Sequence, residues 1–291
     1  MHAIVRKSLP GSALLLAIAA FLSPALQAQE DGPPNVLVIH REYLKPGKGG
    51  MLHDRSEAAF VRAFATGEPN ARYLALDSLS GASRALFLES YESFADWEKE
   101  TKAIGANKAK TAAVDHATLV DGDLLSGFDT AAMMLRPDLS LNKGHIIGTR
   151  YFEFITFLVK PGHTREFTEL AHTYADTYRK VDPQTHWDCF EVMYGNPAPG
   201  TPSGATFVVI ITRESLAEVD KGVKDGEKFA AELGDKGMEK VEELTAASVE
   251  AESTSLFQIN PRMSNPPAEW VKQDQGFWKG PVSSTDKGAS K

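Results

Sequence analysis

Two histidines in the second half of the chain could carry out proton transfer. His172 lies in a stretch with helical spacing of apolar residues, and His186 begins a strand-like run. An imidazole can give and take a proton near neutral pH, as a general acid or base must do. We therefore expect His172 and His186 to be catalytic. Sites for organic ligands combine aromatic surface with a few polar groups, so the expected walls of this pocket are Tyr174, Tyr178, Trp187 and Glu191.

Further polar residues occur on the first strand-like run of each half. His40 and Glu42 are two positions apart, as are Tyr151 and Glu153, so each pair projects from one face of its strand. Buried polar groups are costly unless they are used or paired, and we expect these four to converge inside a barrel as binding residues. The alternative is that they lie at strand ends and form structural bonds with Arg41, Arg72 or Arg150.

No metal site and no cofactor is predicted. The chain contains no His-Glu-x-x-His, Cys-x-x-Cys or phosphate-binding Gly-rich motif. His163 and His172 are nine positions apart, which turns them to opposite faces of a helix. Haem ligation by His172 stays open as an alternative to simple core packing. Cys189, the single cysteine, cannot form an intrachain disulfide, and we expect it to be a buried core residue.

The N-terminus has the pattern of a secretory signal. Arg6 and Lys7 precede an uninterrupted apolar run over 13–22, and Ala28 offers a small residue for cleavage. The run is much shorter than the roughly 20 residues of a membrane-spanning helix, which argues against the alternative of an uncleaved anchor. We expect residues 1–28 to be removed and the protein to be periplasmic or secreted.

The charge balance restricts the partners. The chain has 39 acidic and 31 basic residues, a net charge of −8, and no basic stripe interleaved with aromatic residues. An acidic surface repels phosphate backbones, so nucleic acid is not an expected partner. No second long apolar run occurs, so no membrane association is expected. The expected partner is a small molecule, bound by a monomer or a homodimer.

Three segments of the first half recur in the same order in the second half. Residues 44–47 recur as 159–162, residues 92–99 as 214–221, and residues 135–137 as 259–261. Ordered recurrence at nearly constant spacing is typical of an internal repeat. We predict a first repeat over 35–140 and a second over 146–264.

Hydrophobic periodicity predicts the order β-α-β-β-α-β within each repeat. Ser93 with Asp96, and Ser215 with Glu218, have the spacing of capping boxes that start the second helix of each repeat. This order is ferredoxin-like, and two such units can close into a pseudo-dimeric α/β barrel of the α+β class. The alternative, a βαβββ pairing as in vicinal-oxygen-chelate proteins, requires strands where the capped helices are predicted. The predicted strands cover 35–44, 72–79, 84–91, 128–135, 150–159, 187–194, 205–213 and 255–259.

A family resemblance rests on the turn after the first strand of each repeat. Residues 41–48 (REYLKPGK) and 157–163 (FLVKPGH), each followed by a helix, resemble the opening of NIPSNAP and antibiotic-biosynthesis-monooxygenase-like domains. The pattern of apolar and polar residues matches over most of both repeats, whereas the amino-acid identities match over about eight residues of each. It implies a dimeric α/β-barrel fold. Members range over cofactor-free oxygenases, isomerases, haem enzymes and proteins without known activity, so the resemblance implies no single function.

The function expected from the sequence is that of an exported α/β-barrel protein that binds or transforms a small organic molecule, as cofactor-independent oxygenases and isomerases do. The alternative is an exported protein that only binds a ligand or has a structural role. Because the second repeat is richer in aromatic residues, we expect it to line the principal cavity.

The segment 265–291 follows the second repeat. It is rich in proline and glycine and has a Ser/Lys-rich end, which predicts an irregular tail. Trp270, Phe277 and Trp278 are too apolar for a free tail, so we expect them to attach its first part to the globule.

Overall fold

Runs of β-branched and aromatic residues form eight strands in the computed structural model, which describes residues 32–142, 144, 146–195 and 204–279. The predicted runs overlap all eight strands, although β4 and β8 begin earlier than predicted. The strands are β1 (Val36–Leu44), β2 (Leu74–Ser78), β3 (Arg84–Tyr91), β4 (Leu125–Leu135), β5 (Tyr151–Val159), β6 (Asp188–Tyr194), β7 (Thr206–Arg213) and β8 (Val249–Ile259).

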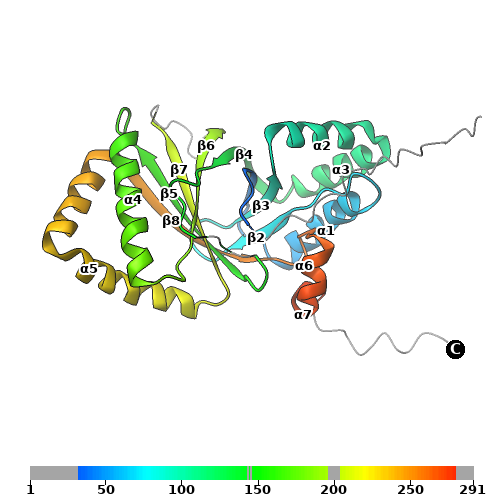
Figure 1. The fold of residues 1–291 in the computed structure, drawn as a ribbon. Helices are drawn as coiled ribbons and strands as arrows, with labels where there is room; N and C mark the ends of the chain where they lie inside the picture. The colour runs from blue at the N-terminus through cyan, green and yellow to red at the C-terminus, as the bar shows by residue number, and fades with distance from the viewer. Residues whose placement is uncertain (1–31, 143, 145, 196–203, 280–291) are drawn as a thin grey trace, which may run out of the picture. The chain divides into compact units, whose positions relative to one another are not determined.

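The strands pair antiparallel into one closed barrel in the order β1-β3-β2-β8-β5-β7-β6-β4 (Figure 1). β4, β1, β3 and β2 come from the first half of the chain, and β8, β5, β7 and β6 come from the second. The halves meet where β2 pairs with β8, with Leu76 opposite Ile259, and where β4 pairs with β6, with Leu135 opposite Phe190. Closure leaves no unpaired strand edge. The protein is therefore an α+β protein built on a closed antiparallel barrel.

Apolar side chains from both halves fill the barrel interior. Leu37 and Ile39 of β1 and Phe152 and Phe154 of β5 belong to one buried cluster, which also includes side chains of the other strands. The rings of Phe152 and Phe154 are stacked with their centroids 6.2 Å apart. Interior side chains of an eight-stranded barrel fill the available space, and this filling explains why nearly every strand is strongly apolar.

The polar pairs on the first strands point away from this interior. Successive side chains of a strand point to opposite faces, so His40 and Glu42 lie on the face of β1 opposite to Leu37 and Ile39. Tyr151 and Glu153 lie on the helix-covered face of β5 for the same reason. The expectation that these four residues converge inside the barrel is wrong, because strand alternation turns the apolar residues Leu37, Ile39, Phe152 and Phe154 inward and these four outward.

Helices cover the outside of the barrel. α1 (Met51–Ala65), α2 (Phe94–Ala106) and α3 (Lys108–Asp121) belong to the first half, and α4 (Thr164–Val181) and α5 (Ala217–Ser248) to the second (Figure 1). The apolar face predicted for α4 is buried at Phe167 and Leu170. α5 bends at Gly234, where φ is 64°, a left-handed conformation that glycine adopts without strain.

One of the two predicted capping boxes forms. The Ser93 side chain accepts a hydrogen bond from the backbone N–H of Asp96 at the start of α2. At the corresponding place in the second half, the residue before α5 is Leu216, and no side-chain cap is formed there. Glu218 instead accepts a hydrogen bond from the backbone N–H of Glu214. Matching letters therefore do not ensure matching local geometry.

The chain after the barrel is helical where the sequence predicts an irregular tail. α6 (Ala268–Gln273) and α7 (Gln275–Trp278) follow β8. Trp270, Phe277 and Trp278 pack against the barrel cluster, as expected. The Arg150 guanidinium lies 4.0 Å from the centroid of the Phe277 ring. The predicted Ser/Lys-rich end of the tail lies outside the described residues.

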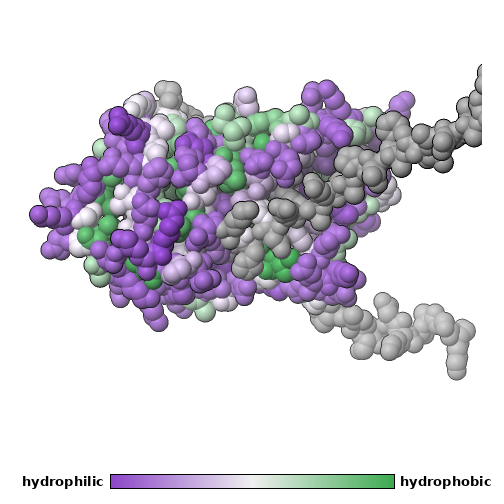
Figure 2. All heavy atoms as spheres, in the orientation of Figure 1, coloured by the Kyte–Doolittle hydropathy of each residue, from purple (hydrophilic) through white to green (hydrophobic). Residues whose placement is uncertain are grey.

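The outer surface carries much of the polar composition. Figure 2 shows a face that is mainly hydrophilic, with small apolar areas between polar ones. In the part of the chain that the structure describes, no helix combines the length and the apolar character needed to cross a bilayer.

Candidate functional site

A cavity of about 690 Å³ lies in the second half, between α4 and the outward faces of β5 and β7. Alternate residues of the two strands form its floor, because every second side chain of a strand faces the helices. Ile155 and Phe157 come from β5, and Val209 and Ile211 come from β7. Further apolar lining comes from α4, at Phe167, Leu170 and Ala171.

Aromatic rings form one side of this cavity. Tyr174 and Tyr178 of α4 stack on Phe229 of α5, with ring centroids 4.7 and 5.1 Å apart. Trp187 meets Tyr178 edge to face at 5.8 Å, and its indole N–H donates to the carbonyl oxygen of Leu139 at 2.9 Å. Burial raises the pKa of both tyrosine hydroxyls, so they stay protonated at neutral pH. The rings form a wall with fixed orientation that suits contact with an apolar ligand.

Polar groups lie around this aromatic wall. Arg213 donates from Nε and Nη2 to Oε2 of Glu153, at 3.0 and 2.5 Å. Nε2 of His186 lies 2.8 Å from Oγ1 of Thr212. The described lining carries more acidic than basic side chains: Glu153, Asp182, Glu214, Glu218, Asp225 and Glu252 against Arg213 and Lys221.

The structure brings together some of the predicted site residues and separates others. Glu153, Tyr174, Tyr178, His186 and Trp187 all line the cavity of the second half. The other three predicted residues of this half, His172, Tyr151 and Glu191, do not line it.

The separated residues have positions that explain their absence from the cavity. Nε2 of His172 lies 3.1 Å from the carbonyl oxygen of Asp138, so the imidazole is held beside the loop after β4. Glu191 accepts a hydrogen bond from Arg136 at 2.8 Å. Helical spacing placed His172 near Tyr174, but it could not show that the ring turns toward a different segment.

Neither the imidazole nor the thiol in the described lining suits haem as an axial ligand. His186 is the single imidazole among these lining residues, and its Nε2 is already within hydrogen-bonding distance of Thr212. Burial raises the pKa of the Cys189 thiol to about 12, which disfavours a thiolate ligand. The thiol is buried, as the sequence predicts. His186 and Cys189 therefore do not fit haem as axial ligands in this cavity.

A second cavity, also of about 690 Å³, lies in the first half between β1, α1 and α3. It receives His40 and Glu42, the two predicted binding residues of this half. Nδ1 of His40 lies 2.9 Å from Oγ1 of Thr130, and the His40 ring stacks on Phe128 with centroids 6.0 Å apart. The aromatic residues of its wall are Phe60, Phe64, Tyr73, Phe87 and Phe128.

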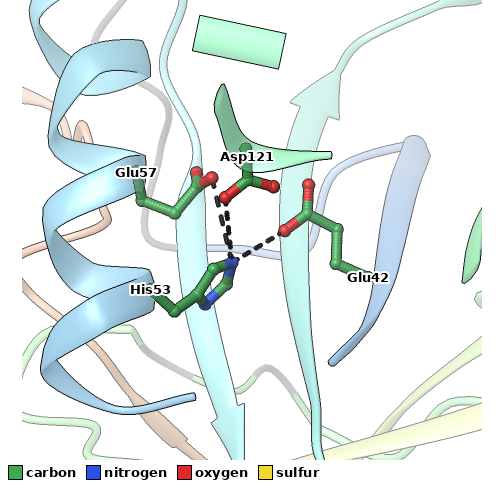
Figure 3. Close-up of side chains that lie close together, drawn as sticks. All are labelled: Glu42, His53, Glu57 and Asp121. Carbon is green, nitrogen blue, oxygen red and sulfur yellow. Dashed lines mark hydrogen bonds and ion pairs between the residues drawn. The ribbon is translucent and has the colours of Figure 1, made fainter. Parts of the chain in front are cut away.

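Glu42 belongs to a buried group that the sequence analysis did not find. His53 and Glu57 of α1 and Asp121 at the end of α3 lie beside it, as Figure 3 shows. His53 and Glu57 are four residues apart and so share one helix face, a signal that was available in the sequence. The contribution of Asp121 could not be found from the sequence, because α1 and α3 meet only in the folded chain.

Burial dominates the electrostatics of this group. Burial and the neighbouring carboxylates raise the pKa of Glu57 to about 10, and burial also raises the pKa of Glu42. Burial alone would lower the pKa of His53, but its hydrogen bond to Glu42 and the nearby carboxylates raise it overall. Glu42, His53 and Glu57 therefore hold protons more tightly than they would in water when no other cation is near.

Comparisons with known proteins give similarities to solved structures. No protein-family profile and no curated protein matches the chain. An anthrone oxidase-like protein is 13% identical, with a TM-score of 0.49 over 80% of this chain and 92% of the other. A chlorite dismutase variant from Candidatus Nitrospira defluvii is 10% identical, with a TM-score of 0.45 over 82% and 95%. A haem-binding protein from Thermus thermophilus is 12% identical, with a TM-score of 0.44 over 79% and 93%. Identities and scores this low assign no function to the chain.

Proposed function

We propose that this protein binds a small, mainly apolar organic molecule in the cavity of the second half. The observation that carries the proposal is the lining itself, where an apolar floor, the ring wall of Tyr174, Tyr178 and Trp187, and the polar groups Glu153 and His186 face one space. Binding sites for organic molecules have this composition, mostly apolar with a few converging polar groups.

The charge of the cavity favours a neutral or cationic ligand. Six acidic and two basic side chains line it in the described residues, and both basic groups are already paired. Arg213 is bonded to Glu153, and Lys221 lies between Asp182 and Asp225. An organic anion would meet unfavourable potential here, whereas an amine could also contact the faces of the aromatic rings.

If the bound molecule is transformed, His186 is the group that we assign to proton transfer. It is the single imidazole in the described lining, and an imidazole can both donate and accept a proton. Thr212 lies against its Nε2 and would orient the ring. The alternative is binding without chemistry, with His186 as a hydrogen-bonding partner only.

Two further proposals concern the origin and the location of the chain. We infer that the halves are tandem ferredoxin-like units. The β-α-β-β-α-β order of elements in each half supports this inference, with α2 and α3 together taking the place of the second helix in the first half. Export rests on the N-terminal pattern, which lies outside the described residues. The intact mass of protein recovered from the producing cells tests export, because cleavage after Ala28 removes residues 1–28.

Binding can be tested with a matched pair of probes that differ in charge. We expect 4-phenylbutylamine to bind the full chain in isothermal titration at least about 10-fold more tightly than 4-phenylbutyrate. Ala171→Phe places a ring inside the cavity and should abolish amine binding, since Ala171 is a lining residue. Thr173→Phe is the matched control, because Thr173 lies on the same helix and does not line the cavity.

Native mass spectrometry of the purified protein tests for a bound ligand without a chosen probe. A retained organic molecule that Ala171→Phe loses and Thr173→Phe keeps would support the proposal. If the amine binds equally to wild type and Ala171→Phe, the cavity is not the site. Turnover of an identified ligand that His186→Gln leaves unchanged would contradict the proton-transfer role and favour the binding-only alternative.

A further inference from the structure

Four ionisable side chains are enclosed together in the first half. They are far in sequence from the residues that line the ligand cavity proposed above, and they come from other elements. Glu42 comes from β1, His53 and Glu57 from α1, and Asp121 from the end of α3 (Figure 3). Their exposed fractions are 7, 1, 3 and 2% respectively. Acidic residues are almost never this buried without a compensating partner.

The four side chains point toward one another. Nε2 of His53 lies 3.0 Å from Oε2 of Glu42, 3.7 Å from Oδ1 of Asp121 and 3.9 Å from Oε1 of Glu57. One potential ligand atom from each residue lies within 4.8 Å of the other three. Ligands on opposite sides of a small divalent ion are about 4 Å apart, so atoms so arranged can surround one ion with little movement.

Two carboxylate oxygens in this group have no hydrogen-bond partner in the described residues. Oε1 of Glu57 and Oδ1 of Asp121 are both fully enclosed, and both face the Nε2 atom of His53 (Figure 3). Buried acceptors are normally satisfied by a donor, and a buried carboxylate without one is unfavourable. The group is therefore incomplete as a set of hydrogen bonds.

The barrel architecture does not itself require these charges. Glu42 is the seventh residue of the nine-residue strand β1, and Phe157 is the seventh residue of the nine-residue strand β5. Phe157 packs on Phe167 of α4, with ring centroids 5.4 Å apart. At this position the second half places apolar rings between its first strand and first helix, whereas the first half places acids and an imidazole there.

We propose that Glu42, His53, Glu57 and Asp121 bind a divalent first-row transition metal ion. Three carboxylates supply hard oxygen ligands and one imidazole supplies nitrogen, a set that suits Mn²⁺, Fe²⁺ or Zn²⁺. The imidazole disfavours Mg²⁺ and Ca²⁺, which take oxygen ligands almost exclusively. The ion supplies the positive charge that the buried carboxylates lack.

The ion would be reachable from the cavity of the first half. Glu42, Glu57 and Asp121 line that cavity, so one side of the four-residue group faces a space with aromatic walls. The hydroxyl of Tyr73 also lines it and has no hydrogen-bond partner among the described residues. A metal centre with such an opening can accept a ligand from the cavity, as catalytic metal sites do.

The test is metal binding by the full chain after chelator treatment. We expect one Mn²⁺ per chain, seen as loss of the free-ion signal in electron paramagnetic resonance, and competition by Zn²⁺ but not by an equal concentration of Mg²⁺. Pulsed spectra should show coupling of the bound Mn²⁺ to an imidazole nitrogen, and His53→Gln should remove that coupling. Glu57→Gln and Asp121→Asn should each weaken binding more than about 10-fold.

Asp188→Asn is the matched control, because Asp188 is a partly buried acid outside both cavities, and it should bind Mn²⁺ as wild type does. Metal should also raise the melting temperature of the wild type and not that of Glu57→Gln. The proposal is overturned if wild type binds no Mn²⁺ or Zn²⁺, if Mg²⁺ competes equally, or if Glu57→Gln and Asp121→Asn bind like wild type. None of these results depends on the ligand cavity of the second half.

Discussion

At the scale of single residues, buried acids in this protein have different surroundings. Glu153 has a guanidinium beside it, and Glu42 has an imidazole. Asp188 pairs with Ile210 across β6 and β7 and shares its strand face with Phe190, so it points into the apolar barrel. Its Oδ1 has no hydrogen-bond partner among the described residues. The burial of this oxygen of Asp188 is therefore not compensated by a hydrogen bond from the described residues.

Asp188 should make stability depend on pH. Burial raises its pKa to about 7 from an ordinary value of 3.8. The folded chain then holds the proton more tightly than the unfolded chain, so this contribution to stability is full below about pH 4 and is lost as the pH rises to 7. The loss amounts to at most about 4 kcal/mol. We expect Asp188→Asn to be more stable than wild type at pH 8 and similar at pH 4 in urea unfolding. If Asp188→Asn and wild type are equally stable at pH 8 and also at pH 4, the carboxylate of Asp188 is solvated or paired.

At the scale of elements, the two halves of the chain differ in local structure where their sequences agree. Ser93 and Ser215 stand at matching positions before α2 and α5, with an acid three residues later in each case. The side chain of Ser93 caps α2, whereas α5 begins one residue later and lacks a side-chain cap. A capping box needs the serine in an extended conformation just outside the helix, and this conformation depends on how the preceding strand enters the helix.

This difference gives a matched pair of substitutions. Ser93→Ala removes the Oγ atom that accepts a hydrogen bond from the backbone N–H of Asp96, and it should lower the free energy of unfolding by about 1 kcal/mol. Ser215→Ala removes no cap and should change it by less than about 0.5 kcal/mol. Chemical denaturation of both variants compares them directly. An equal loss in the two would mean that α5 is also capped by its serine in solution.

At the scale of the whole molecule, the barrel depends on the chain that follows it. Trp270, Phe277 and Trp278 of the last two helices pack against the barrel cluster, although they come after the last strand. Arg150, directly before β5, lies over Phe277 and forms an ion pair with Asp274. The final segment therefore packs on the hydrophobic core of the barrel.

Removing one of these rings should destabilise the entire fold. Phe277→Ala exposes barrel side chains and loses the contact with Arg150, and we expect a loss of about 2 kcal/mol, below the value for a fully buried phenylalanine. Leu119→Ala is the control, because Leu119 is an exposed apolar residue on α3 and its loss should cost less than about 0.5 kcal/mol. Thermal unfolding would contradict this view of the tail if the two variants melted together.

The sequence by itself determined the elements and much of one cavity. Period-two and helical patterns, with Lys-Pro-Gly turns, were enough for the order of strands and helices, because these signals depend on neighbouring residues. Five residues chosen for aromatic or acid–base character, among them His186 and Trp187, do line the cavity of the second half. Tertiary structure alone decided which face of each strand is enclosed, because a period of two shows that the faces differ but not which one meets the barrel interior. It also decided that Asp121 of α3 meets Glu42 and His53. Asp121 follows these residues by 79 and 68 positions, so the contact depends on how three elements pack together.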